Sequence, residues 1–249
     1  GFEIARRLGH TLTSPTPGLA PLLLSKNDDL HGELSGVSHD VELTLWVDGV
    51  VACRIRGVML WTHFGISGPA ALDMSRHWLR ATLDACAARL TANFCPGAGF
   101  DDLDRRWTTL AAERPKSTVR SALATLVPAS VAAAVLRRLH IDATLTLAHF
   151  PRDERRRLAL ALIAWPLPVV DSRGYDYAEV TAGGVPLTEI NAATMESRVC
   201  PRLYLVGEIL DVDGRIGGFN FQWAWSSAHV TATALARRSV EEVRVFARP

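Results

Sequence analysis

The stretch GEILDVDGRIGGFNFQWAWSSA, Gly207–Ala228, combines acids, paired glycines, aromatic residues and small residues within a short span. Together with the apolar run Leu203–Val206, it predicts a short strand that ends at Glu208, then a loop, then a helix of roughly eighteen residues that begins at Gly217 and Gly218. Open α/β sheets bind ligands at the carboxyl ends of strands, and the first turn of a helix attracts negative charge. The stretch therefore predicts a ligand-binding βα unit, and the same spacing also fits a βα unit with a purely structural glycine-rich turn.

The segment DVDG within this stretch has the appearance of a calcium loop. An EF-hand loop needs an acid at its fifth position and a glutamate at its twelfth. Counting from Asp211 places Arg215 and Gln222 there instead. The histidines and cysteines also lack the spacing of a metal site. We therefore expect no metal, and we expect Asp211 and Asp213 to shape turns.

Two further motifs are incomplete. GISGP, Gly65–Pro69, has a proline where a nucleophile elbow has its second glycine, and it better fits a helix start with Ser67 near the N-cap and Pro69 in the first turn. GAGF, Gly97–Phe100, would need a glycine in place of Asp102 to be a dinucleotide fingerprint. The sequence holds no complete phosphate-binding fingerprint and identifies no catalytic side chain.

The composition limits the classes of protein to which the chain can belong. Its 249 residues carry a net charge of +1, which gives no general attraction to nucleic acids or acidic membranes. The longest apolar run, Leu158–Val170, is too short to span a bilayer and contains Pro166 and Pro168. The cysteines are scattered, at Cys53, Cys86, Cys95 and Cys200. We expect a reduced, cytoplasmic protein with neither a nucleic-acid partner nor a membrane partner.

The character of the sequence changes several times along the chain. Residues 20–62 alternate apolar and polar and contain an Asp-Gly turn within Val47–Val50, which is typical of antiparallel strands and consistent with a small barrel. A long helical region follows, Asp101–Ala164, with two breaks. The last third returns to strand, turn and helix. The chain opens at Gly1 directly into a helical pattern, and we therefore expect a fragment of a longer protein.

Three stretches resemble one family. AEVTAGGVPLTEINAATMESRVCPRLYLVGEILDVDGRIGGFNFQWAWSSA, Ala178–Ala228, resembles the carboxy-terminal signature of bacterial NAD(P)/FAD-dependent oxidoreductases, among them aminoacetone-oxidase-like proteins and dehydro-bile-acid reductases. RGVMLWTHFGISGPAALDMSRHW, Arg56–Trp78, resembles the insert domain of that family. GFEIARRLGHTLTSPTPGLAPLLL, Gly1–Leu24, resembles the segment that precedes the insert.

The resemblance implies an α/β fold, α+β overall, in two parts. Residues 1–21 and 175–249 would form a partial, Rossmann-like FAD-binding domain, and residues 22–174 would form an insert. Within the insert we expect a β-barrel at about 22–98 and a helical subdomain at about 99–165. The amino-terminal region of the family, which holds the GxGxxG turn, is not in this sequence. The chain alone is therefore expected to bind FAD weakly or not at all.

The resemblance also implies a set of cofactor-binding positions. Glu208 matches the acid that bonds the ribityl chain of FAD in related flavoproteins, and Gly217 begins the helix entrance that faces the flavin or the pyrophosphate. The turn Thr181–Val185 is expected to line the same cavity. The full set is Gly207, Glu208, Gly217, Gly218, Phe219, Asn220, Gly183 and Gly184.

The function implied is that of a flavin-dependent oxidoreductase. Hydride would pass between FAD and an unidentified small organic substrate, with NAD(P)H as the linked reductant, and the scattered cysteines exclude a redox disulfide beside the flavin. Two alternatives stay open. One is an inactive truncated fragment. The other is a module whose helical region docks nucleic acid or protein through basic residues interspersed with acids, namely Arg105, Arg106, Arg137, Arg138 and Arg155–Arg157.

Overall fold

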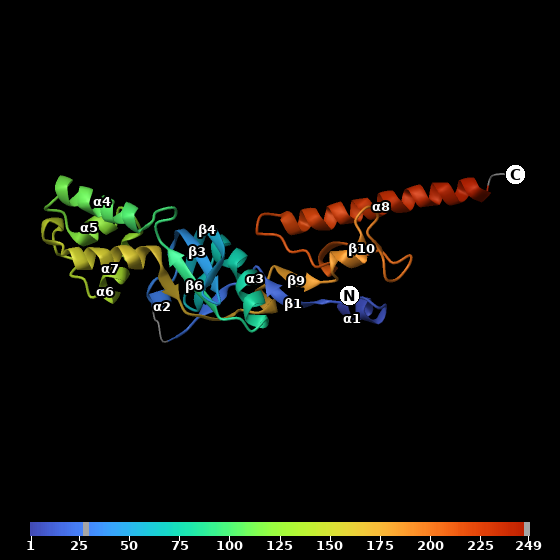
Figure 1. The fold of residues 1–249 in the computed structure, drawn as a ribbon, viewed down its shortest axis with the longest axis horizontal. Coiled ribbons are helices and arrows are strands. Elements are labelled where there is room, and N and C mark those ends of the chain that lie inside the picture. Colours follow the sequence, from blue (N-terminus) through green and yellow to red (C-terminus); the bar gives the residue numbers. More distant parts are fainter. Residues whose placement is uncertain (27–29, 247–249) are drawn as a thin grey trace. The chain divides into compact units, whose positions relative to one another are not determined.

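The structure, a computed structural model, describes residues 1–26 and 30–246, with side chains described as far as Arg238. The chain divides into two compact units (Figure 1). The terminal unit consists of Gly1–Leu19 and Ala178–Pro249, and the central unit consists of Ala20–Tyr177. The expected assignment of the terminal part of the chain to an FAD-binding domain and of the central part to an insert stays a prediction.

The central unit is built on a seven-stranded sheet in the order β7-β6-β3-β4-β5-β2-β8. Every neighbouring pair in this sheet is antiparallel. The strands are β2 (Leu22–Leu24), β3 (Ser38–Val47), β4 (Val50–Thr62), β5 (Gly65–Ser67), β6 (Ala88–Asn93), β7 (Trp165–Leu167) and β8 (Val169–Ser172). Strands β7 and β8 follow the helical region, so the chain returns to the sheet after it leaves it.

The predicted hairpin is confirmed by the pairing of β3 with β4. Val47 lies opposite Val50, and the two residues between them, Asp48 and Gly49, have φ values of 51° and 82°. Positive φ at both central residues is the signature of the turn whose twist suits a two-residue hairpin. The Asp-Gly dipeptide therefore sets the register of the two longest strands.

Helix α3, Pro69–Leu83, starts where GISGP predicts a helix, with Pro69 in the first turn. The expected cap is corrected, because Ser67 belongs to β5 and the N-cap is Gly68, which makes no side-chain cap. Gly68 has a φ of +84°, and a Cβ there would lie 3.0 Å from the backbone oxygen of Val58. Because the chain passes so close to β4 at this position, glycine fits where a residue with a capping side chain would not.

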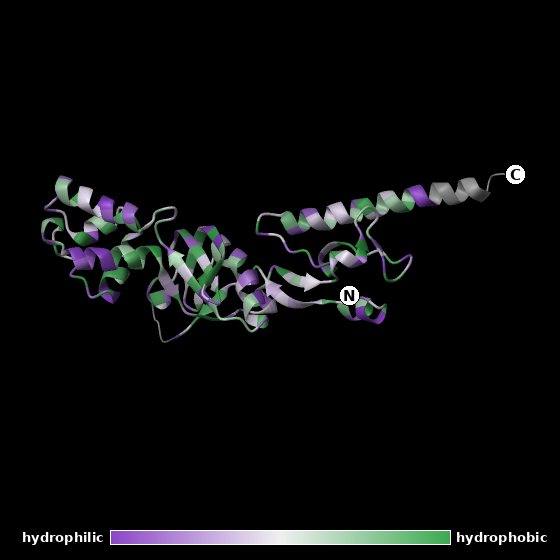
Figure 2. Cartoon of the chain, viewed as in Figure 1, coloured by the Kyte–Doolittle hydropathy of each residue, from purple (hydrophilic) through white to green (hydrophobic). Residues whose placement is uncertain are grey.

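The predicted helical region forms one end of the central unit (Figure 1). Thr118 caps one of its helices, since its Oγ1 accepts a hydrogen bond from the Ser121 N–H. The last helix begins with charged residues and ends with apolar ones, which Figure 2 shows as a change from purple to green. The elements are α4 (Phe100–Glu113), α5 (Val119–Leu123), α6 (Ala129–Arg138), the 3₁₀ turn η1 (Leu147–His149) and α7 (Arg152–Ile163), with the short α2 (Leu30–Glu33) and η2 (Tyr175–Tyr177) elsewhere in the unit.

One hydrophobic core joins the sheet to these helices. Phe94, at the end of β6, packs against Trp165 with ring centroids 5.9 Å apart. Trp107 of α4 meets Phe150 edge-on at 5.9 Å, next to α7. Because the core is continuous, the sheet and the helices form a single packed unit.

Among its described residues, the terminal unit has a small core of six buried residues, Ala5, Val185, Ile190, Met195, Leu205 and Leu210. Strand β1 pairs antiparallel with β9, and β10 pairs antiparallel with β11. Its elements are α1 (Phe2–Arg7), β1 (Thr13–Gly18), β9 (Val180–Gly184), η3 (Leu187–Glu189), β10 (Ile190–Asn191), β11 (Glu196–Ser197), η4 (Gly207–Ile209) and α8 (Phe219–Phe246).

Two expectations about this unit are corrected. The predicted strand Leu203–Val206 is reduced to an isolated bridge between Tyr204 and Glu196, because no longer partner strand runs beside it in the described residues. The last helix has 28 residues, well beyond the predicted length. The mixed α/β class with a large antiparallel sheet is confirmed, whereas the Rossmann-like character stays a prediction. Among the described helices, none is long and apolar enough to cross a membrane.

Candidate functional site

Helix α8 holds the backbone of Gly207 on both sides. The Gly207 N–H donates to Ser227 Oγ at 3.0 Å, and the Gly207 carbonyl accepts from Trp223 Nε1 at 3.0 Å. Gly207 has a φ of +72°, and a Cβ there would lie 3.7 Å from Ala224. The turn that carries Glu208 is therefore fixed to the helix by two side chains one turn apart.

The loop between this turn and α8 is closed by Asn220. The Asn220 Oδ1 accepts from the Gly214 N–H at 2.7 Å, and Asn220 Nδ2 donates to the Gly214 carbonyl at 3.1 Å. A Cβ on Gly214 would lie 2.8 Å from the Cβ of Phe219, so the fold leaves no room for a side chain there. Both ends of the Asn220 amide are thus committed to the loop.

The glycine pair forms the entrance to α8, as the sequence predicts. Gly217 and Gly218 have φ values of +121° and +88°, which glycine adopts readily. The helical bonding begins when the Gln222 N–H donates to the Gly218 carbonyl at 2.9 Å. The exposed ring of Phe219 lies under the guanidinium of Arg215, 4.7 Å from its carbon.

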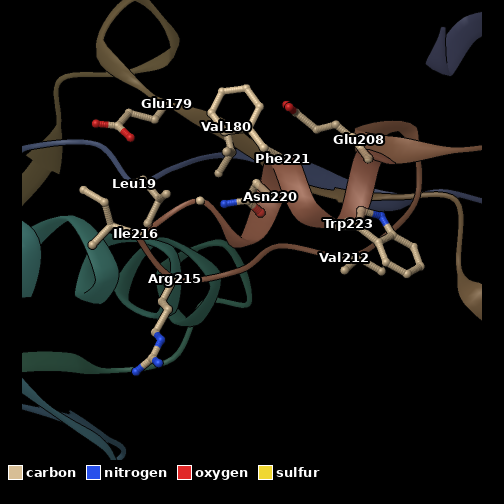
Figure 3. Close-up of a pocket in the computed structure, with 13 residues that line it drawn as sticks. Leu19, Glu179, Val180, Glu208, Val212, Arg215, Ile216, Asn220, Phe221 and Trp223 are labelled. Atoms are coloured by element: carbon tan, nitrogen blue, oxygen red, sulfur yellow. The ribbon is translucent and has the colours of Figure 1, made fainter. Parts of the chain in front are cut away.

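A cavity of about 460 Å³ opens beside this entrance (Figure 3). Glu179 and Glu208 bring carboxylates to one side, and Arg215 extends away on the opposite side. The wall between them is largely apolar. The lining residues are Leu19, Glu179, Val180, Glu208, Val212, Arg215, Ile216, Gly217, Gly218, Asn220, Phe221, Trp223 and Ala224.

Glu208 is oriented by the neighbouring strand. Its Oε1 accepts a hydrogen bond of 2.7 Å from the Thr181 N–H in β9, and no described residue bonds its second oxygen. Asp211 anchors the following loop, because its Oδ2 accepts from Thr13 Oγ1 at 2.8 Å. Within the described residues, no three His, Cys, Asp or Glu side chains gather as a metal site requires.

Gly183 and Gly184 are not among the residues that line this cavity, and their expected part in cofactor binding stays a prediction. They end strand β9 rather than forming a turn, because Gly184 pairs with Thr13 of β1. A Cβ on Gly183 would lie 2.7 Å from the Ser14 carbonyl, and one on Gly184 would lie 2.5 Å from the Ile209 carbonyl. Their conformation brings three backbone segments together.

The structure brings Glu208, Gly217, Gly218 and Asn220 of the predicted set to one cavity, while Gly207 and Phe219 lie next to it. Sequence reasoning missed Leu19, Glu179 and Trp223 as lining residues. Trp223 could have been found, since it lies one turn into the helix that the glycines begin. Leu19 lies far from the motif in the sequence, and no local signal identifies it.

A second polar network of the terminal unit lies outside the cavity. Buried His10 bonds Glu189 Oε2 through Nδ1 at 2.6 Å and Ser197 Oγ through Nε2 at 2.9 Å. This order matches a Ser-His-acid triad, but Ser197 Oγ also accepts from the N–H groups of Val199 and Cys200. A buried hydroxyl with these bonds has no lone pair for a substrate, so the network is structural.

The same network lowers the pKa of Glu189. Burial alone would raise that pKa, but hydrogen bonds from the Thr11 hydroxyl, from His10 and from the Thr11 N–H outweigh it. The carboxylate therefore stays ionised and joins the segment before β1 to the turn η3.

Comparison with known proteins gives a consistent set of relatives. The chain is 30% identical over 238 residues to a 3-dehydro-bile acid delta(4,6)-reductase of Clostridium scindens, which covers 96% of this chain and 58% of the relative. It is 30% identical over 238 residues to a ribosomal RNA dihydrouridine synthase of Haemophilus influenzae, with 96% and 56% covered. It is 32% identical over 237 residues to a ribosomal RNA dihydrouridine synthase of Escherichia coli, with 94% and 56% covered.

The chain thus spans just over half the length of these relatives. A protein-family profile, described as the HI0933-like protein barrel and H2TH domain, matches residues 16–180. That range contains the whole central unit with its sheet and helices. Because the profile covers more than half of the chain, the protein belongs to the HI0933-like family.

Proposed function

We propose that the terminal unit contributes part of a flavin site and that the protein acts as a flavin-dependent oxidoreductase. The observation that carries this proposal is the meeting of Glu208 and the entrance of α8 at one cavity. An acid and a helix amino terminus are the two groups that the resemblance assigns to FAD. Under this proposal the central unit is the insert, and the terminal unit is the partial FAD-binding domain.

The residues of the cavity suit a flavin. The second oxygen of Glu208 can accept a hydrogen bond from a ribityl hydroxyl, while Thr181 keeps the carboxylate in place. Trp223 and Val212 offer apolar surface to a planar ring. The unsatisfied N–H groups in the first turn of α8 favour negative charge, such as that of a reduced flavin or of a phosphate. When bound, FAD would supply the hydride chemistry.

The names of the relatives suggest a common kind of substrate. In a 3-dehydro-bile acid with double bonds at positions 4 and 6, these bonds are conjugated with a carbonyl. The uracil ring of uridine also contains a carbon–carbon double bond that is conjugated with a carbonyl. Both names therefore describe reduction of a carbon–carbon double bond that a carbonyl polarises. We propose the same reaction for this protein, with NADH or NADPH as the source of hydride.

The carrier of that double bond is either a small molecule or an RNA. We favour a small molecule, because several arginines that could form a nucleic-acid surface are paired with acids in the structure. Arg105 lies 3.5 Å from Asp102, and Arg155 lies 3.0 Å from Asp104. RNA is the second candidate, because two relatives are named for ribosomal RNA.

A comparison of two ketones tests the proposed reaction. The chain, supplied with FAD and with NADH or NADPH in the absence of oxygen, is mixed with cyclohexenone or with the saturated cyclohexanone. We expect oxidation of the nicotinamide that depends on FAD and on the enone, and none with cyclohexanone. Reduction of uridine in an RNA, without reduction of the enone, would identify RNA, the second candidate, as the substrate. Failure to reduce either would contradict the proposal.

A further inference from the structure

The motif THFGISGP, which the flavin proposal leaves unused, forms one side of a second cavity, in the central unit. This cavity has a volume of about 700 Å³, within the range of small-molecule sites. It is lined by Leu23, Leu24, Ser25, Lys26, His31, His63, Phe64 and Val170. The lining thus combines apolar side chains with three basic ones, and no acid belongs to the described set.

His31 is the unusual member of this lining. It is 4% exposed, yet its Nδ1 is a buried atom with no hydrogen-bond partner in the part of the chain that the structure describes. Native proteins bury few such atoms, because an unsatisfied polar group loses its water without compensation. A ligand with a polar head in the cavity would give this nitrogen a partner.

The wall of the cavity is firmly built. The Leu24 N–H donates to the Phe64 carbonyl at 3.1 Å, which joins β2 to the turn before β5. Gly65 lets the strands approach, since a Cβ there would lie 2.3 Å from the Leu22 carbonyl. His63 packs edge-on against the ring of Phe64 at 5.1 Å, and the guanidinium of Arg173 lies over that ring, 4.6 Å from its centroid.

The chemistry of these groups selects a ligand. Lys26 offers an ammonium group at the exposed edge of the cavity, His63 offers a second exposed donor, and His31 offers a buried one. Phe64 and Val170 offer apolar surface beside them. We propose that this cavity binds an apolar organic acid, with its carboxylate at Lys26, His31 and His63 and its body against Phe64. The site is separate from the flavin proposal and does not depend on it.

The two lysines of the chain provide a matched test. Lys26 lines the cavity, whereas Lys116 is exposed elsewhere in the central unit. The full chain is acetylated with increasing concentrations of 2-naphthoate, or of the neutral 2-naphthamide, and each lysine is followed by mass spectrometry. We expect naphthoate to protect Lys26 but not Lys116, and we expect naphthamide to protect neither. No FAD is needed, so the result is independent of the flavin site.

Variants then identify the groups involved. For His31→Phe we expect at least a tenfold rise in the naphthoate concentration that protects Lys26, with unchanged or greater resistance to urea, because an unpartnered buried nitrogen is removed. If His31→Phe does not fold, the naphthoate concentration that protects Lys26 is measured in His63→Gln, a variant at an exposed position of the cavity. His140→Gln is the control. Equal protection by naphthamide, protection of both lysines, no protection of Lys26, or protection unchanged in both cavity variants would overturn the proposal.

Discussion

The side-chain amide of Asn220 bonds both backbone groups of Gly214, as acceptor at 2.7 Å and as donor at 3.1 Å. This pair closes the loop in front of α8 and sets the position of the glycine entrance. Asn220 therefore acts on any ligand of the cavity through the loop, as a positioning residue. The resemblance alone assigned it to the face that meets the flavin.

Replacing Asn220 with alanine removes both of these hydrogen bonds. We expect the free energy of unfolding of the terminal unit to fall by about 1–3 kcal/mol, the usual net value of two such bonds. Hydrogen exchange of peptides across residues 207–222 measures it. Gln222→Ala is the control, because the exposed side chain of Gln222 bonds, among the described residues, only Ser226 on the same helix. Equal exchange in the two variants would contradict the role of Asn220.

Substitutions at Gly184 and Gly218 distinguish the cost of a strained backbone conformation from the cost of a steric clash. Both have positive φ, but a Cβ on Gly184 would lie 2.5 Å from the Ile209 carbonyl, whereas no described residue beyond its two chain neighbours lies within 4 Å of one on Gly218. We expect Gly218→Ala to cost about 1–2 kcal/mol from the left-handed backbone alone. Gly184→Ala should cost roughly 3 kcal/mol or more, because backbone atoms must also move. Urea denaturation followed by hydrogen exchange of β9 measures the difference, and similar costs for the two would count against the packing described here.

The depressed pKa of Glu189 makes part of the stability depend on pH. A carboxyl whose pKa is lower in the folded than in the unfolded state stabilises the fold above its unfolded pKa, and this contribution is lost as the pH falls through the folded pKa. We therefore expect Glu189→Gln to destabilise the terminal unit at neutral pH and to differ less from wild type as the pH falls through and below the ordinary range of glutamate.

Unfolding of wild type and variant across the acidic range measures this effect. Glu179→Gln changes the net charge equally without touching the His10 network, and it serves as the control. A destabilisation by Glu189→Gln that is the same at neutral and acidic pH would show that the ionised carboxylate is not the stabilising form.

Cys95 should be a slow nucleophile in the folded protein. Burial raises the pKa of its thiol to about 11, although the nearby Arg106 acts in the opposite direction. At pH 8 only about one thiol in a thousand is then ionised, so alkylation should be about 100-fold slower than in unfolded protein. Pulsed iodoacetamide labelling with mass spectrometry in buffer and in urea measures the ratio. Equal rates would mean that the partial burial of Cys95 does not suppress its ionisation.

Local patterns in the sequence predicted the elements whose geometry is set by neighbouring residues. Asp48 and Gly49 determine the hairpin of β3 and β4, and Gly217 with Gly218 determines the start of α8, because turn conformation is a property of those residues themselves. The helical region and its two breaks were also predicted from the residues of that segment. In contrast, the predicted strand at Leu203–Val206 depends on a partner strand, which its own residues do not specify.

The residues of the candidate site also divide into those that a local pattern predicted and those that depend on tertiary packing. Glu208 and the glycines lie within one short motif, so the motif alone predicted them. Leu19 and Glu179 reach the cavity from segments that meet α8 only through tertiary packing. Gly183 and Gly184 are not in the lining of the cavity, and their surroundings follow from the pairing of β9 with β1, which no pattern at those positions reveals.

A flavin titration tests the central claim, that Glu208 and the entrance of α8 form part of a flavin site, most directly. FAD is added to the wild-type chain, to Glu208→Gln and to the control Glu113→Gln, an exposed acid of α4 in the central unit, and the flavin absorbance and fluorescence are followed. We predict weak, saturable binding to wild type and to the control, and an affinity at least tenfold lower for Glu208→Gln, since a charge-assisted hydrogen bond is worth about 1.5–3 kcal/mol. An affinity for FAD that is unchanged in Glu208→Gln, or one that falls as far in the control, would contradict the claim.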